Sequence, residues 1–181
     1  LRPGVDDSER GDRMVQALQE TEGPRSKRAS ILTAAIESFG KDGYEHTKWA
    51  KVADEVGIGQ TALYHYFESK AHCLLTIMSL ELNRSLERFR EVTADITPAD
   101  KALEAAIAAA YDVTPHEVLH MRILQSHMDL LATPRPSEKE EIERERARGL
   151  VRDIESEWTA LLARGMKTKE FPKRDPHALA T

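Results

Sequence analysis

The sequence predicts an all-α protein, and three observations support this prediction. Apolar residues recur at helical spacing in two short segments on either side of Gly57. They do so again over two long segments, residues 70–92 and 138–166. Pro98, Pro115, Pro134 and Pro136 fall between predicted helices or at their first positions, where proline is tolerated. The 181 residues are enough for one domain, or for a small domain joined to a larger helical one.

Composition narrows the possible functional classes. The single cysteine, Cys73, excludes an internal disulfide and suits a reducing cytoplasm, which is the expected location. The longest apolar run, residues 105–111, is too short to span a membrane, and no signal-peptide pattern precedes the first predicted domain. The net charge is −5, but residues 25–70 hold seven lysines and arginines against six acidic residues. The acidic excess therefore lies outside that segment.

Residues 1–24 are polar and are predicted to form an extension with a short helix near residues 14–18. Three helices are expected over residues 25–68. Val52, Ala53 and Val56 give the middle helix an apolar stripe. Thr47 is its expected N-cap, and Gly57 its expected end, because glycine adopts the left-handed conformation without steric cost.

The next helix is expected to begin near residue 59 or 60, with Leu63 and Phe67 facing the core. The outer side would then carry Gln60, Thr61, Tyr64, His65 and Tyr66. Two short helices joined by a glycine turn form a helix-turn-helix, whose second helix fits the major groove of DNA. One corner of an ordinary helical bundle is the alternative that spacing alone leaves open.

The segment Leu63-Tyr64-His65-Tyr66-Phe67-Glu68-Ser69-Lys70, with Leu74 after it, resembles the recognition helix and the start of the fourth helix in the tetracycline-repressor (TetR) family of bacterial transcription regulators. Upstream residues resemble the first helix of that family and the turn that follows it. They are Ile31, Ala35, Ile36, Phe39, Gly43 and Tyr44. The resemblance is specific over residues 25–75. It implies a DNA-binding domain at residues 25–70 and a C-terminal helical regulatory domain at residues 71–181. It also implies a homodimer formed through the last two helices, most of which would lie beyond Thr181.

Position by position, the resemblance implies which residues contact DNA. Base edges would be reached by Gln60, Thr61 and His65, and phosphates by Thr47, Tyr64, Tyr66 and Lys70. A basic segment before the first helix consists of Arg25, Lys27 and Arg28. Two interpretations place it on DNA, along the backbone or in the minor groove, and the alternative is ordinary surface charge. Three residues depart from the family pattern. Lys48, which is also expected to face DNA, stands where a second hydroxyl is common, and Ala62 lacks a phosphate-binding hydroxyl. Gly59 is a weaker N-cap than the serine that would suit its position.

The remaining chain is predicted to be helical. The expected helices cover residues 70–92, 102–113, 115–131 and 138–166, with Gly165 ending the last. The alternating charges in the first half of the last helix are interpreted as a solvated face, and its second half as buried. Phe171-Pro172 and Asp175-Pro176 resemble the family's connection into an eighth helix.

The segment His116-Glu117-Val118-Leu119-His120 satisfies the zinc-protease pattern, in which two histidines one turn apart bind zinc and the glutamate activates water. The extended pattern fails, because Ile123 stands in place of a glycine and Ser126 in place of a third histidine. A helical metalloenzyme is therefore kept only as an alternative, and no metal, cofactor or catalytic residue is predicted. A DNA-binding architectural protein without an effector is the other alternative.

The resemblance implies a ligand-responsive regulator, usually a repressor that a small molecule releases from its operator. Candidates for lining an effector cavity lie on or near apolar stripes, and several add a polar tip. They are Leu86, Phe89, Ile107, Tyr111, His120, Leu124, His127 and Trp158. Such a lining favours a largely apolar effector, but the same residues would also serve as plain core. The expected partners are thus a double-stranded DNA operator, a small effector and a second copy of the chain.

Overall fold

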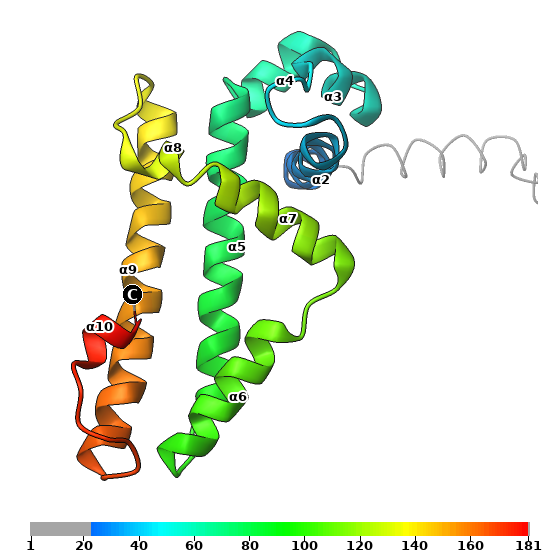
Figure 1. The fold of residues 1–181 in the computed structure, drawn as a ribbon. Coiled ribbons are helices and arrows are strands. Elements are labelled where there is room, and N and C mark those ends of the chain that lie inside the picture. Colours follow the sequence, from blue (N-terminus) through cyan, green and yellow to red (C-terminus); the bar gives the residue numbers. More distant parts are fainter. Residues whose placement is uncertain (1–22, 181) are drawn as a thin grey trace, which may run out of the picture. The chain divides into compact units, whose positions relative to one another are not determined.

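A computed structural model describes residues 23–180 (Figure 1). The expected extension, residues 1–24, lies outside the described residues except for its last two positions, and the short helix expected near residues 14–18 lies wholly outside them. The described residues form helices joined by turns and include no strand, which confirms the all-α prediction. None of these helices is long and apolar enough to cross a membrane. The chain divides into two compact units at the bond between Tyr66 and Phe67.

The first unit contains α2 (Pro24–Asp42), α3 (Trp49–Val56) and α4 (Gln60–Tyr66). All three helices contribute to its apolar core. The buried residues are Ile31, Ala35, Ile36 and Phe39 of α2, Trp49, Val52 and Ala53 of α3, and Leu63 of α4. Polar contacts also join α2 to α3, because the Ser38 hydroxyl donates to the Glu55 carboxylate at 3.1 Å and the Lys51 ammonium lies 2.6 Å from the Asp42 carboxylate.

The turn between α3 and α4 is built as the sequence predicts. Gly57 is the C-cap of α3 and adopts the left-handed conformation, with φ 70° and ψ 39°. Its N–H donates to the carbonyls at the end of α3, and the N–H of Ile58 donates to the carbonyl of Ala53 at 3.0 Å. These bonds satisfy carbonyls that the last turn of a helix otherwise leaves without partners.

The predicted capping role of Thr47 is wrong. The N-cap of α3 is Lys48, whose side chain makes no capping hydrogen bond. Thr47 is 3% exposed, and its hydroxyl lies 2.8 Å from the carbonyl oxygen of Gly43 and 3.1 Å from that of Ser38. The hydroxyl therefore donates to carbonyls at the end of α2, and the residue at the N-cap position of α3 is Lys48.

Gly57 allows a matched pair of substitutions. Gly57→Ala should lower the free energy of unfolding by about 1 kcal/mol, because a side chain at positive φ is strained. A Cβ at Gly57 would meet no atom within 4 Å, so the loss is conformational. Gly57→Asn is the control, because asparagine adopts the left-handed conformation more readily than alanine, so it should lose clearly less stability. Urea unfolding of both variants provides the measurement, and equal losses would contradict the prediction.

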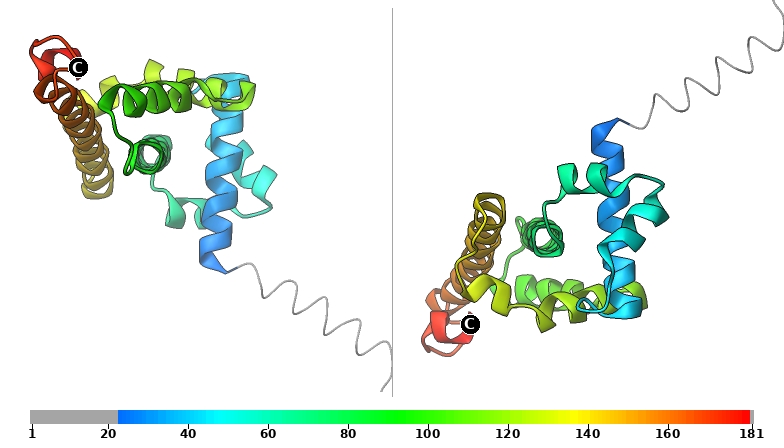
Figure 2. Two further views of the ribbon diagram at one scale, coloured as in Figure 1. Left: turned by 90° about the horizontal axis from the view of Figure 1, so that it is seen from below. Right: turned by 90° about the horizontal axis from the view of Figure 1, so that it is seen from above.

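The second unit contains two long helices, α5 (Lys70–Thr93) and α9 (Glu138–Lys167), together with α6 (Ala99–Tyr111), α7 (Pro115–Ser126), α8 (Asp129–Ala132) and α10 (Pro176–Ala180). Helices α5 and α9 lie side by side, and Figure 2 shows α5 end-on with α9 beside it. They run in the same direction, because Ser69 contacts Glu140 near their first turns and Arg90 contacts Glu157, at 2.6 Å, further along. The pair forms the centre of this unit.

One end of the α5–α9 pair encloses an apolar cluster with α6. Its buried members are Phe89, Ala99, Ala102, Ala106 and Leu161, and Ile96, Leu103, Trp158 and Phe171 pack around them. The rings of Phe89 and Trp158 have centroids 4.8 Å apart. The alanines of α6 allow close packing here, because their side chains are small.

Two predicted helix ends in this unit are wrong. The helix expected over residues 115–131 is interrupted, because α7 ends at Ser126 and α8 begins at Asp129. His127 is the C-cap of α7, and its ring Nδ1 lies 2.7 Å from the carbonyl oxygen of Ile123, which belongs to the last turn of that helix. In addition, α6 begins at Ala99 and not at residue 102, and ends at Tyr111.

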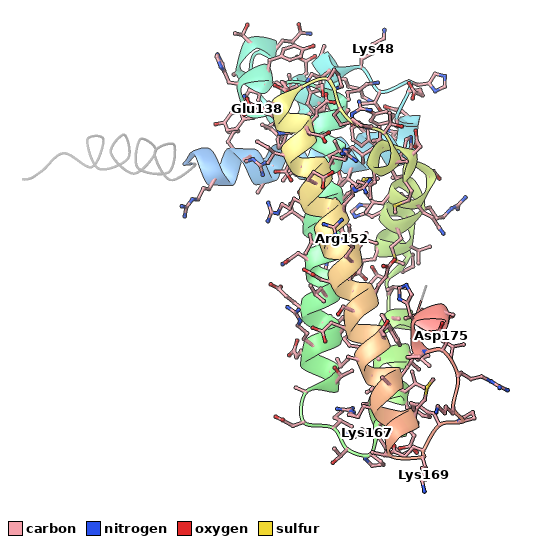
Figure 3. The ribbon with its side chains drawn as sticks, turned by 90° about the vertical axis from the view of Figure 1, so that its left-hand side faces the viewer. Lys48, Glu138, Arg152, Lys167, Lys169 and Asp175 are labelled. Carbon is pink, nitrogen blue, oxygen red and sulfur yellow. The ribbon has the colours of Figure 1, made fainter. Side chains whose placement is uncertain are left out.

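Helix α9 also differs from its prediction. Gly165 does not end it, since the helix continues to Lys167, and the ring of Phe171 packs against the Cα of Gly165. The charged first half is not only a solvated face, because Glu140 and Arg144 are each 5% exposed. Figure 3 labels residues along this helix, from Glu138 in its first turn through the exposed Arg152 to Lys167 at its end.

Candidate nucleic-acid interface

The structure brings four of the predicted DNA-contacting residues together on the outer side of α4. Gln60, Thr61, Tyr64 and His65 are all exposed, and Tyr64 is 52% exposed. Gln60 and Tyr64 are one helical turn apart, as are Thr61 and His65, so the four side chains form one continuous patch. We call this patch the α4 face.

The opposite side of α4 is anchored in the first unit. Leu63 is fully buried, and its N–H donates to the carbonyl of Gly59 at 3.0 Å, which continues the turn into the helix. Tyr66 and Ala62 are half-buried. The α4 face is therefore rigidly presented, because a buried leucine and a tight glycine turn fix the helix that carries it.

The α4 face offers chemistry suited to base edges. A glutamine amide can both donate to and accept from adenine in the major groove, and a threonine adds a hydroxyl and a methyl group. The exposed phenol of Tyr64 can donate to a phosphate oxygen. Large aromatic side chains kept exposed on a short helix are typical of a binding surface.

The other predicted contacts differ in how the structure presents them. Lys48 is exposed directly before α3, and its side chain is labelled in Figure 3. Arg25 is exposed in the first turn of α2, whereas Lys27, Arg28 and Lys70 are half-buried. The buried hydroxyl of Thr47 faces carbonyls of its own unit, so in this structure it is not presented to a phosphate.

Charge around the α2–α3 contact is largely balanced within the protein. The Asp42 carboxylate, by hydrogen bonding to Lys51, raises the pKa of that ammonium, and Lys51 lowers the pKa of Asp42 in return. Glu55 lies 3.9 Å from the same ammonium. Lys51 thus contributes little free positive charge to this unit, in which Lys41 and Lys48 are exposed cations.

Glu117, the glutamate of the zinc-protease pattern, has a structural role. Its carboxylate accepts from the Thr114 N–H at 2.7 Å and from the Thr114 hydroxyl at 2.9 Å, and that hydroxyl accepts from the Glu117 N–H at 3.2 Å. These bonds form a complete capping box, with Pro115 at the first helical position. The Thr114 N–H is the main cause of a lowered pKa of Glu117, followed by the Thr114 hydroxyl. The sequence did contain this signal, Thr-x-x-Glu before a helical segment.

Among the side chains that the structure describes, no three histidine, cysteine or acidic groups are placed so that they could hold a metal ion. The remaining oxygen of the Glu117 carboxylate lies 3.0 Å from the guanidinium of Arg84 on α5. A capping and tethering role for Glu117 therefore accounts for its contacts.

The eight candidate effector-lining residues are not gathered around one enclosed space. Leu86 and Phe89 are buried, and Trp158 is half-buried against Phe89, as expected for core. Tyr111 is 83% exposed and Ile107 is 44% exposed. The remaining three, His120, Leu124 and His127, are half-buried on α7 or at its end. An open hollow along α6 includes only Ile107 of the eight, beside Asp100, Leu103, Glu104 and Ala108.

Comparison with known proteins gives this geometry its context. Residues 31–77 match the family model described as "Bacterial regulatory proteins, tetR family". The chain is 26% identical over 153 residues to "HTH-type transcriptional repressor KstR2" of Rhodococcus jostii (strain RHA1), an alignment that covers 84% of this chain and 71% of that protein. The chain spans about half the length of other curated relatives, 57% and 52% in two examples.

Solved structures share the fold. The TetR family transcriptional regulator PfmR from Thermus thermophilus has a TM-score of 0.69 at 23% identity, over 83% of this chain and 78% of that one. The transcriptional regulator FadR from Bacillus subtilis, solved in complex with stearoyl-CoA, has a TM-score of 0.62 at 18% identity, over 84% and 78% of the two chains. The family match thus identifies residues 31–77, which hold the helix-turn-helix, as a segment of the tetR family of bacterial regulatory proteins, and the solved structures show a shared fold.

Proposed function

We propose that the chain is a transcriptional repressor that binds an operator through the α4 face and is released by a small, largely apolar effector. The observation that carries this proposal is the α4 face itself, with Gln60, Thr61, Tyr64 and His65 exposed on a helix whose other side is buried. The family match covers α4, the turn before it and the start of α5. An architectural role without an effector has no observation in its favour.

The second unit is the proposed effector-binding part, acting in the cytoplasm. The relative KstR2 is named a repressor, and the structural neighbour FadR was solved with stearoyl-CoA. The first supports a repressor, and the second supports a regulatory bundle in which a ligand with a long apolar chain shifts the balance between conformations. The proposed lining keeps the half-buried candidates, which are His120, Leu124, His127 and Trp158, whereas the exposed Tyr111 lies on the surface of the single chain.

Operator binding is proposed to involve two copies of the chain. A two-fold dimer presents two recognition helices, so its site is roughly palindromic with half-sites about 34–36 Å apart, or a multiple of that spacing. The proposed dimer contact involves the C-terminal helices. An effector that changes the separation of the two α4 faces would then weaken binding.

Selection of double-stranded DNA from a random pool tests the proposed function. We expect enrichment of a roughly palindromic motif, because the α4 face combines base-reading side chains with a rigid helix. The control is the same selection with a chain in which Gln60, Thr61 and His65 are replaced by alanine, which should enrich no motif. Recovery of no motif with the unaltered chain would contradict a sequence-specific regulator.

A further inference from the structure

Glu140 is a buried carboxylate whose partners come from outside its own helix. It lies in the first turn of α9 and is 5% exposed. The Ser69 hydroxyl donates to its Oε1 at 2.5 Å, and the Arg135 guanidinium donates through Nε to its Oε2 at 2.9 Å. One side chain thus joins the start of α5, the α8–α9 loop and α9. We call Ser69, Arg135 and Glu140 the Glu140 junction.

The junction uses a carboxylate that the sequence pattern assigns to capping. Ser137 is the N-cap of α9 and accepts from the Glu140 N–H at 3.4 Å, so Ser-x-x-Glu has the spacing of a capping box. In the complete box of α7, the Glu117 carboxylate returns to the N-cap residue of its own helix. Both oxygens of Glu140 are instead bonded to Ser69 and Arg135. Burial of a carboxylate is unfavourable without such partners, so the two bonds determine its position.

Ser69 links this carboxylate to the first turn of α5. It is the N-cap of α5. Its Oγ accepts from the His72 N–H at 2.9 Å, and its hydroxyl donates a hydrogen bond to Glu140. The His72 ring in turn accepts from the Glu68 N–H at 3.3 Å. Only residues 67–69 separate α5 from α4 in the sequence. The bond to Glu140 therefore acts on the residue at which α5 begins.

The other side of the junction is tied to α8. The Arg135 N–H donates to Glu141 at 2.8 Å, and Arg144 and Arg148 both donate to the carbonyl of Leu131, at 3.0 and 3.1 Å. Hydrogen bonds from Arg144 and then from the Arg135 N–H lower the pKa of Glu141 to about 2, so it stays ionised. These contacts hold the end of α8 and the following loop on the first turns of α9.

We propose that Glu140 is a positioning residue for the recognition helix. It fixes the first turn of α5 in register with the end of α8 and the α8–α9 loop. A displacement of α8 by an effector then reaches Ser69, and through residues 67–69 it reaches α4. This inference rests on the proposed function and adds the route by which the second unit controls the first.

A swap of donor and acceptor tests the junction apart from helix capping. Aspartate caps helices as well as serine does, but in Ser69→Asp the side chain cannot donate to Glu140 and repels it. We expect Ser69→Asp to weaken binding to the selected operator by about fivefold or more. Adding Glu140→Gln should restore affinity to about that of the unaltered chain, because the glutamine amide can donate to the new aspartate.

Glu138→Gln is the matched control, because Glu138 is exposed in the same turn of α9. Combined with Ser69→Asp it should restore nothing. Unchanged affinity in Ser69→Asp, or no recovery with Glu140→Gln, would overturn the inference. If Ser69→Asp does not fold, Ser69→Gly keeps the cap tolerable and removes the donor, and the same weakening is expected. A chain that binds its operator but is insensitive to these variants removes this inference alone, whereas a chain with no operator overturns the proposed function as well.

Discussion

Replacement of Gln60, Thr61 and His65 together by alanine should lower affinity for the selected operator by about a hundredfold or more. Each lost base contact removes about 1–3 kcal/mol of discrimination, and losses at separate positions are roughly additive. Binding to unrelated DNA should change little, because phosphate contacts supply most of it. The measurement is a pair of titrations, with operator and with scrambled duplex, at one fixed salt concentration.

A matched triple variant separates this effect from general damage to the first unit. Thr33, Glu37 and Lys41 are exposed on α2, and their replacement by alanine also leaves the net charge unchanged. Exposed substitutions of this kind change stability by about 0.5 kcal/mol or less each. We expect the control to retain the preference for operator. A similar loss in both triple variants would show that the α4 face does not read bases.

The local part of the fold was predictable because local rules determine it. The apolar stripe of Val52 and Ala53, the left-handed Gly57 and the buried Leu63 all follow from helical period and glycine stereochemistry. The α4 face follows from the same period, since whatever lies opposite Leu63 is exposed. Its identification as a DNA-binding surface depended on resemblance, because spacing alone fits a helical bundle equally well.

Two of the errors concern polar side chains with more than one acceptable partner. Thr47 had the composition of an N-cap, but its hydroxyl donates to carbonyls at the end of α2. Glu140 lies on the predicted solvated face of α9, but it is buried and accepts from the hydroxyl of Ser69, 71 residues away. A polar side chain has several acceptable partners nearby, and only tertiary packing selects one of them. The effector lining stays a prediction, because helical spacing cannot show whether facing residues such as Phe89 and Trp158 leave a space.

Helix α9 contains two glycines whose replacement should have opposite effects. Alanine is favoured over glycine inside a helix by about 0.5–1 kcal/mol, so a glycine with open surroundings gains stability on substitution. A Cβ at Gly149 would meet only the Arg152 guanidinium, at 3.8 Å, which is ordinary contact. We therefore expect Gly149→Ala to stabilise the protein by about that amount, and it serves as the control for the second glycine.

Gly165→Ala should instead destabilise the protein by about 1–3 kcal/mol, the usual effect of overpacking. A Cβ there would lie 2.2, 2.3 and 2.9 Å from three atoms of the Phe171 ring, which must then leave its place. The ring packs beside the cluster of Phe89, Ala102 and Leu161, so its displacement also exposes apolar surface. The displacement would also disturb the chain after α9, because the carbonyl of Gly165 accepts the N–H of Phe171 at 3.0 Å.

A double-mutant cycle identifies the ring as the cause. Phe171→Ala alone should destabilise by loss of burial, and Gly165→Ala added to it should have no further unfavourable effect, since the clashing ring is absent. Urea unfolding of the two single variants and the double variant gives a coupling energy of about 0.5–3 kcal/mol if the contact is as described. Strict additivity of the two losses would mean that Gly165 is required for a reason other than the Phe171 ring, and the packing of the chain that leads into α10 would need another explanation.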